Sequence, residues 1–225
     1  NDTFIFYAVV KGKIDTEDLS FKEVLLDVET LNEMALRAEL DMTKTSYHAF
    51  GYLRENYCLL RSGSAIGRGC GPLVVSKKDY TAEDLKGKRI AIPGRLTTAY
   101  LLFQLFSSTF SLQPSNPPLH LFTKGGRGGI IEMPFYKIMD AVVKGDADAG
   151  LIIHEGRFTY PSYGLKKILD LGEWWERDTG LPVPLGGILA KRNLGEDLIK
   201  RIDSILRKSI EYALSHRDEP KFYIK

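Results

Sequence analysis

Apolar and polar segments alternate along the whole chain at spacings typical of helices and strands. The apolar run at residues 4–10 follows Asn1, Asp2 and Thr3. These residue types cap helices by accepting hydrogen bonds from free backbone amides, so the chain is expected to open with a helix. Over the rest of the first third we expect a strand at 21–28, a helix at 29–37, a strand at 41–46, a helix at 47–55, and strands at 57–61 and 71–76.

The alternation continues beyond a charged connector at residues 77–88, interrupted by an irregular stretch rich in Pro and Gly at 111–129. Gly145 is expected to end a helix, because glycine accepts the left-handed conformation found at helix ends. The remaining expected elements are a strand at 89–92, helices at 97–106 and 134–144, strands at 149–153 and 167–171, a helix at 174–178, a strand at 186–190 and a helix at 194–215. This order predicts an α/β fold with mostly parallel sheets.

Two segments are expected to carry the chain between lobes. These are the polar connector at 77–88 and the extended stretch at 181–184. The first lobe would then be discontinuous, made of residues 1–78 and 185–225, with residues 79–184 inserted as the second lobe. This arrangement predicts a ligand cleft between the lobes.

Composition narrows the function classes. The chain has 225 residues, of which 44% are hydrophobic and 27% charged, as in ordinary globular proteins. A net charge of +2 gives no bulk attraction to nucleic acid, and no apolar run approaches the roughly 20 residues that a membrane span needs. The cysteines, Cys58 and Cys70, lie outside any CxxC spacing, so we expect two buried thiols and a reducing cytoplasm.

Two strand-to-helix junctions are candidate anion sites. At residues 93–100 the free amides and the hydroxyls of Thr97 and Thr98 meet at a helix start, although Thr97 would serve equally well as a plain cap. At residues 43–46, Lys44 offers a positive charge to a ligand, with a solvated lysine as the alternative, and Ser46 begins another helix.

His154 is the best candidate for a general base, because it follows an expected buried strand and an imidazole titrates near neutrality. A purely structural histidine is the alternative. His48, His120 and His216 lack the spacing of metal ligands, and no P-loop lysine follows the glycines at 125–129. Trp174 and Trp175 are expected to pack in the core and at its rim.

Several strings are similar to the 1,4-dihydroxy-6-naphthoate synthase family, namely NDTFIFY at the start, residues 93–100, GLIIHEGRFTY at 150–160, and residues 181–190. The resemblance implies a type II periplasmic-binding-protein fold and a cytoplasmic lyase. The lyase would convert cyclic dehypoxanthine futalosine, a small-molecule carboxylate, to 1,4-dihydroxy-6-naphthoate in the futalosine route to menaquinone. It also implies that no metal or organic cofactor is needed. His154 matches the catalytic base of the family, and its substrate-binding segments are matched by Lys44, Thr45, Ser46, Thr98 and Ala99.

Two other functions suit the same fold, because fold does not fix function. One is a non-catalytic solute-binding protein for small anions, and the other is chorismate dehydratase, an enzyme of the same pathway. No nucleic-acid or membrane partner is expected, and an isologous homodimer is the default form of any homo-oligomer. The sequence departs from the family pattern at both ends, because family members have a strand and a Ser-Pro-Cys-Pro turn before the position of Asn1 and continue past the position of Lys225.

Overall fold

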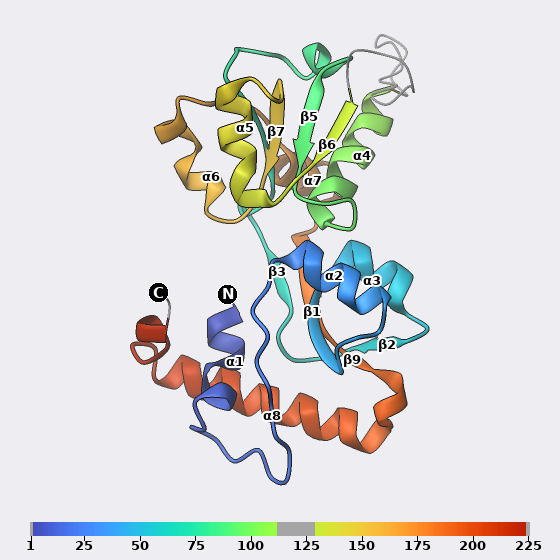
Figure 1. Ribbon diagram of the computed structural model, residues 1–225, viewed down its shortest axis with the longest axis vertical. Helices are drawn as coiled ribbons and strands as arrows, with labels where there is room; N and C mark the ends of the chain where they lie inside the picture. The colour runs from blue at the N-terminus through green and yellow to red at the C-terminus, as the bar shows by residue number, and fades with distance from the viewer. Residues whose placement is uncertain (1, 112–128, 224–225) are drawn as a thin grey trace. The chain divides into compact units, whose positions relative to one another are not determined.

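The computed structural model describes residues 2–111 and 129–223, and these fold into two compact units (Figure 1). The first unit comprises Asn1–Ala65 and Gly186–Lys225, and the second comprises Ile66–Leu185. The sequence predicts the first crossing thirteen residues later, after residue 78. The structure differs because β4 (Leu73–Ser76) pairs with strands of the second unit. The expected irregular stretch falls mostly on residues 112–128, which lie outside the described residues.

The first unit is built around the antiparallel strand β9 (Val183–Lys191), which begins in the second unit and lies between β1 and β2. Its other elements are α1 (Asp2–Val10), α2 (Val28–Leu36), β1 (Met42–Ser46), α3 (Tyr47–Leu53), β2 (Tyr57–Leu59), η4 (Arg192–Leu194), α8 (Glu196–Ser215) and η5 (Pro220–Tyr223). β3 (Ala65–Gly67), at the other crossing, also pairs with β9.

The prediction of mostly parallel sheets is wrong for this unit, because both β1 and β2 run antiparallel to β9. Parallel neighbours need a crossover connection, usually a helix, between consecutive strands. Here the central strand returns from the second unit instead. Helices α1 and α8 pack against each other and bury an apolar cluster that includes Ile5, Ile188 and Ile205.

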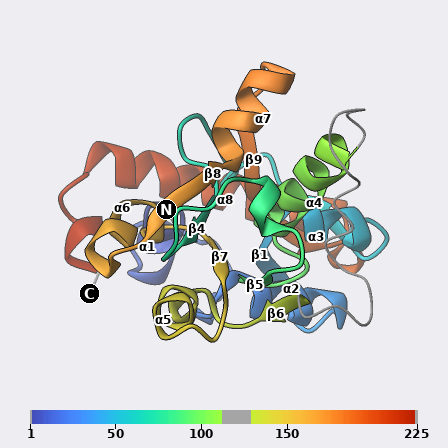
Figure 2. The same ribbon diagram turned by 90° about the horizontal axis from the view of Figure 1, so that it is seen from above.

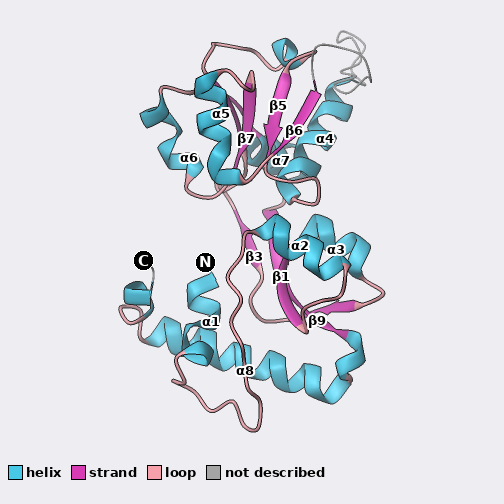
Figure 3. Cartoon of the chain, viewed as in Figure 1, coloured by secondary structure: helices cyan, strands magenta, loops and turns pink. Residues whose placement is uncertain are grey.

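The strand expected at residues 21–28 does not form. Residues 20–27 have no regular structure and are drawn as loop in Figure 3, and the side chains of Val24, Leu25 and Leu26 are 43%, 73% and 46% exposed. An apolar run becomes a strand only where another strand pairs with it. The segment ends at Asp27, which caps α2 by accepting hydrogen bonds from two of its first amides.

The second unit holds a mixed five-stranded sheet in the order β6-β5-β7-β4-β8. The strands β5 (Arg89–Ile92), β6 (Gly129–Glu132) and β7 (Ala149–Ile152) are parallel. The sequence predicts β5 and β7, whereas β6 is not among the expected strands. By contrast, β4 is antiparallel to both β7 and β8 (Lys166–Asp170), because it enters directly from the crossing. The helices are η1 (Glu83–Leu85), α4 (Thr98–Ser111), η2 (Phe135–Lys137), α5 (Ile138–Lys144), α6 (Gly156–Thr159), η3 (Tyr160–Tyr163) and α7 (Leu171–Thr179).

Helices cover both faces of this sheet, with α5 on one side and α7 on the other (Figure 2). Strand β4 shows why two cores form, since Leu73 and Val75 face one cluster and Val74 faces the other. Trp174 packs edge to face on Phe106 at a centroid distance of 5.5 Å, which confirms its expected packing role.

Candidate functional site

The candidate site lies at one edge of the sheet in the second unit. Because β5, β6 and β7 are parallel, with Ile90 in register with both Ile130 and Ala149, their carboxyl ends share an edge. The segment leading to Thr98 follows β5, and His154 follows β7. Ligands of open α/β sheets bind outside the carboxyl ends of such strands. The structure thus brings the predicted base to the same edge as Thr98 and Ala99.

The start of α4 combines a cap with backbone amides that no acceptor in the described chain pairs with. Thr97 Oγ1 accepts a hydrogen bond from the Tyr100 amide at 3.2 Å and donates to the Gly94 carbonyl at 2.8 Å, so Thr97 is a helix cap. Thr98 Oγ1 donates to the Leu185 carbonyl at 3.0 Å. Within the described part of the chain, the amides of Thr98 and Ala99 have no hydrogen-bond acceptor. They are available to a small anion.

His154 sits in a tight turn between β7 and α6. Its backbone is left-handed, with φ of 55°, which is uncommon outside glycine and frequent at active sites. Its carbonyl accepts a hydrogen bond from the Arg157 amide at 3.3 Å, and its side chain is exposed. The ring meets Phe135 edge to face at a centroid distance of 5.2 Å. Phe135 comes just after β6, so the segments that follow β6 and β7, the two strands on either side of β5, meet at the imidazole.

A salt bridge joins the loop after β5 to the end of β6. The Arg95 amide donates to Glu132 Oε1 at 3.1 Å, and Arg95 Nε lies 3.4 Å from Glu132 Oε2. Glu132 is the last residue of β6. This contact holds the segment that leads to Thr98 beside the segment that leads to Phe135.

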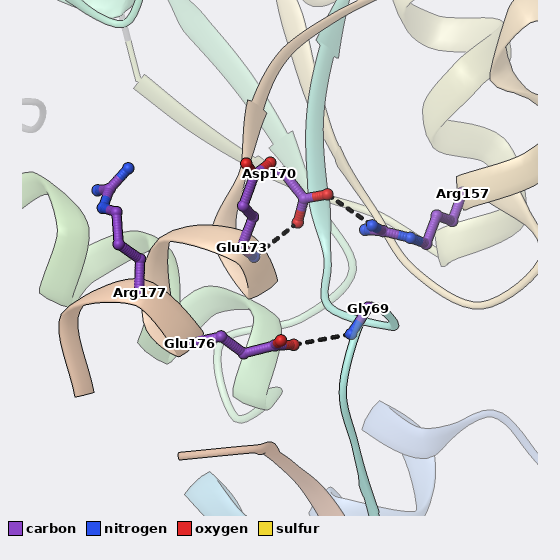
Figure 4. Close-up of a pocket in the computed structure, with 6 residues that line it drawn as sticks. All are labelled: Gly69, Arg157, Asp170, Glu173, Glu176 and Arg177. Carbon is purple, nitrogen blue, oxygen red and sulfur yellow. Dashed lines mark hydrogen bonds and ion pairs between the residues drawn. The ribbon is translucent and has the colours of Figure 1, made fainter. Parts of the chain in front are cut away.

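A pocket of about 470 Å³ lies nearby in the same unit, and Figure 4 shows the residues around it. Its most buried members are Arg157 and Asp170, whose side chains are 19% and 6% exposed and whose Nη2 and Oδ2 atoms lie 2.5 Å apart. The complete lining is Gly69, Arg157, Asp170, Glu173, Glu176 and Arg177. The residues predicted from the sequence are absent from this lining.

The electrostatics of that pair follow from burial and hydrogen bonding. Burial acts to raise the pKa of Asp170, yet this pKa is lowered, because Arg157 and the Glu173 amide both donate hydrogen bonds to the carboxylate. The Asp170 hydrogen bond raises the pKa of Arg157 against the opposing effect of burial. Both groups are therefore charged at neutral pH.

The residues predicted in the first unit lie at the end of β1. The ammonium of Lys44 pairs with Asp2, and the Lys44 side chain is only 15% exposed. The alternative interpretation of Lys44 as a solvated lysine is therefore wrong. Ser46 caps α3 by accepting a hydrogen bond from the Ala49 amide at 3.0 Å. Thr45 is 1% exposed, and its hydroxyl has no hydrogen-bond partner among the described residues.

Sequence reasoning missed Phe135, Arg157 and Asp170. Arg157 lies inside the quoted string GLIIHEGRFTY, three residues after His154, where a signal was available. Asp170, followed by Leu-Gly-Glu, fits a helix cap with an acidic first turn, but its pairing with Arg157 depends on the tertiary fold. Phe135 gave no signal beyond being apolar.

The other histidines and the cysteines lie elsewhere. His216 stacks on Tyr212 at 4.2 Å and His48 contacts Tyr52 at 5.6 Å, while His120 lies outside the described residues. Cys58 is half-buried, and Cys70 is exposed in a glycine-rich turn, so the expectation of two buried thiols is wrong.

The described residues, 2–111 and 129–223, lack two kinds of feature. They contain no group of three or more His, Cys, Asp or Glu side chains arranged to hold a metal ion. None of their helices has the length and apolar character that crossing a membrane requires.

The fold class is that of periplasmic binding proteins. A Candida albicans protein, whose structure defines a family with the generic periplasmic-binding-protein fold, matches with a TM-score of 0.69 at 19% identity over 99% of this chain and 71% of its own. An Archaeoglobus fulgidus protein of known crystal structure matches more closely, with a TM-score of 0.82 at 40% identity over 99% of this chain and 76% of its own.

The family follows from the sequence comparisons. The model of the menaquinone biosynthesis family matches residues 1–225. A 1,4-dihydroxy-6-naphthoate synthase of Thermus thermophilus is 47% identical over all of this chain and 75% of its own length. The corresponding synthase of Streptomyces coelicolor is 41% identical over all of this chain and 74% of its own length. The chain belongs to the menaquinone biosynthesis family, and the resemblance noted from its sequence is confirmed.

Proposed function

We propose that this chain catalyses the conversion of cyclic dehypoxanthine futalosine to 1,4-dihydroxy-6-naphthoate, with release of the sugar-derived fragment. The observation that carries the proposal is the placement of His154 and the start of α4 at one carboxyl edge of the sheet. An elimination from a carboxylate substrate needs a base and an anion site close together. The two relatives named as synthases support this choice of reaction.

In the proposed reaction, the amides of Thr98 and Ala99 bind the substrate carboxylate at the helix N-terminus. His154 removes a proton from a ring carbon, and the electron pair of that C–H bond forms a ring double bond. The bond to the sugar-derived fragment breaks in compensation, and the fragment leaves with its electron pair. Aromatisation of the ring drives the elimination.

We assign Lys44, Thr45 and Ser46 to substrate contacts from the first unit, as the family resemblance implies. Thr45 offers a buried hydroxyl with no hydrogen-bond partner in the described chain, and a buried polar group of this kind is costly unless something binds it. To bind the substrate, the ammonium of Lys44 would give up its ion pair with Asp2.

A panel of substrates tests the proposal. The protein is incubated in separate reactions with cyclic dehypoxanthine futalosine and with chorismate, with EDTA present, and products are followed by mass spectrometry. The proposal predicts the naphthoate from the first reaction and no turnover of chorismate. Dehydration of chorismate would instead identify the other enzyme of the pathway. Calorimetric binding of either carboxylate without turnover would indicate a solute-binding protein.

The surroundings of the proposed reaction are also predictions. We propose a cytoplasmic enzyme that acts without a metal or organic cofactor, and the EDTA in the assay tests the metal part of this statement. A homodimer is the default if the chain self-associates, and light scattering measures it directly.

A further inference from the structure

Arg157 ties the His154 turn to two other parts of the second unit. Its amide donates to the His154 carbonyl at 3.3 Å. Its guanidinium reaches the Gly71 carbonyl through Nη1 at 2.8 Å and Asp170 through Nη2 at 2.5 Å. A single side chain therefore connects the turn after β7, the chain before β4 and the end of β8.

Both acceptors of Arg157 are held in place. Asp170 Oδ1 accepts hydrogen bonds from the amides of Gly172 and Glu173, each at 3.0 Å, and so caps α7. Gly71 touches Gly172 so closely that a Cβ added to it would lie 2.3 Å from the Gly172 Cα. The guanidinium thus binds to two fixed points, as Figure 4 shows for the carboxylate.

Stability alone does not explain the ion pair between Arg157 and Asp170. Buried ion pairs add little net stability on average, because desolvation offsets the attraction. The left-handed backbone of His154 costs about 1–3 kcal/mol and persists only where its surroundings over-determine it. The bonds of Arg157 supply such a constraint three residues away.

We propose that Arg157 and Asp170 are a positioning pair that holds the His154 turn in its left-handed conformation and so aims the imidazole. The inference rests on the proposed function for the role of His154. Neither residue is assigned contact with the substrate. Loss of the pair should therefore slow turnover while substrate binding changes little.

The test uses Asp170→Asn and Arg157→Lys. Asparagine keeps the cap of α7, because its amide oxygen accepts the same hydrogen bonds. Its NH₂ group replaces the oxygen that accepts from Arg157, so the variant removes both the charge and this hydrogen bond. Lysine keeps the charge but lacks the planar fork that reaches Gly71 and Asp170 together. Each variant should lower kcat by about 10- to 100-fold, the range expected for a base displaced by about 1 Å, with KM within about threefold.

The chain contains a matched control pair. Arg89 donates to the Gly145 carbonyl at 2.8 Å and to Asp148 at 3.1 Å, at the opposite edge of the same sheet. Asp148→Asn and Arg89→Lys should lower thermal stability to a smaller extent, because the side chains of Arg89 and Asp148 are 40% and 31% exposed, and should leave kcat within about twofold. Equal kcat losses in both pairs, or unchanged kcat in folded Asp170→Asn, would overturn the inference.

A readout independent of turnover separates this inference from the proposed function. The His154 imidazole resonances, assigned by comparison with His154→Gln, are followed by ¹H–¹⁵N NMR in each variant. Asp170→Asn and Arg157→Lys should shift them, and the control variants should leave them in place. A wild-type protein that turns over no substrate would refute the proposed reaction, while the NMR result would still decide on the positioning pair.

Discussion

Phe135 and His154 meet edge to face, with ring centroids 5.2 Å apart and ring planes inclined at 74°. Phe135 follows β6 and His154 follows β7, and these two strands lie on either side of β5. The contact limits the rotation of an exposed imidazole whose backbone is already constrained. The orientation of the proposed base thus depends on contacts from two directions.

Replacing Phe135 by Leu should reduce kcat by about threefold to tenfold, because an aromatic pair of this geometry contributes about 0.5–1.5 kcal/mol. KM should change little, since Phe135 is not assigned to the substrate. Steady-state kinetics measure both constants. Tyr136→Leu is the control, because Tyr136 is 61% exposed and adjacent in sequence. A drop in kcat of the same size in the control would contradict the account.

Replacing Thr97 by Ala should cost about 1 kcal/mol of stability, the usual effect of losing an N-cap hydroxyl. Urea denaturation measures the change. The proposed anion donors are the amides of Thr98 and Ala99. The Thr97→Ala variant should therefore lose stability while its KM changes little. A rise in KM beyond tenfold with unchanged stability would make Thr97 a ligand contact rather than a cap.

Replacing Gly71 by Ala should destabilise the second unit by at least about 1–3 kcal/mol, the usual cost of overpacking. The new Cβ would meet the backbone of Gly172 at 2.3 Å, and backbone atoms have little room to yield. Gly51→Ala in α3 is the control, because a Cβ there meets nothing within 4 Å. Thermal unfolding of the two variants compares them, and equal melting temperatures would be inconsistent with the close approach.

The stability of the fold should depend on the charge of Asp170. Its pKa is lowered in the folded protein by the hydrogen bonds from Arg157 and the Glu173 amide, although burial opposes them. A lowered folded pKa gives stability that is complete above the unfolded pKa, about 3.9, and is lost as the pH falls through the folded pKa. Urea titrations between pH 2 and 6 should show a shallower acid loss for Asp170→Asn than for wild type. Parallel curves would argue against this assignment.

Local signals predicted most of the elements. Gly145 ends α5 with a left-handed φ of 84°, and Ser46 begins α3 as its cap, because both effects act within a few residues. The start of α4 and the turn at His154 were likewise placed from neighbouring residues. Such signals depend mainly on residues close in the sequence.

Features that depend on distant partners were not predicted. Residues 21–28 have an apolar pattern but no strand beside them, and β9 pairs antiparallel because it returns from the second unit. Asp170 and Arg157 are 13 residues apart and meet only because the fold brings the start of α6 to the end of β8. The sequence contains each partner, but no local pattern says which partners meet.

The most direct test of the account is the turnover of cyclic dehypoxanthine futalosine by His154→Ala, measured as naphthoate formation by mass spectrometry. Loss of a general base typically costs about 10²- to 10⁴-fold, so kcat should fall at least about 100-fold. Calorimetric substrate affinity should stay close to that of wild type. His216→Ala is the matched control, because that ring stacks on Tyr212 in the first unit. Near-normal turnover by folded His154→Ala would contradict the central claim.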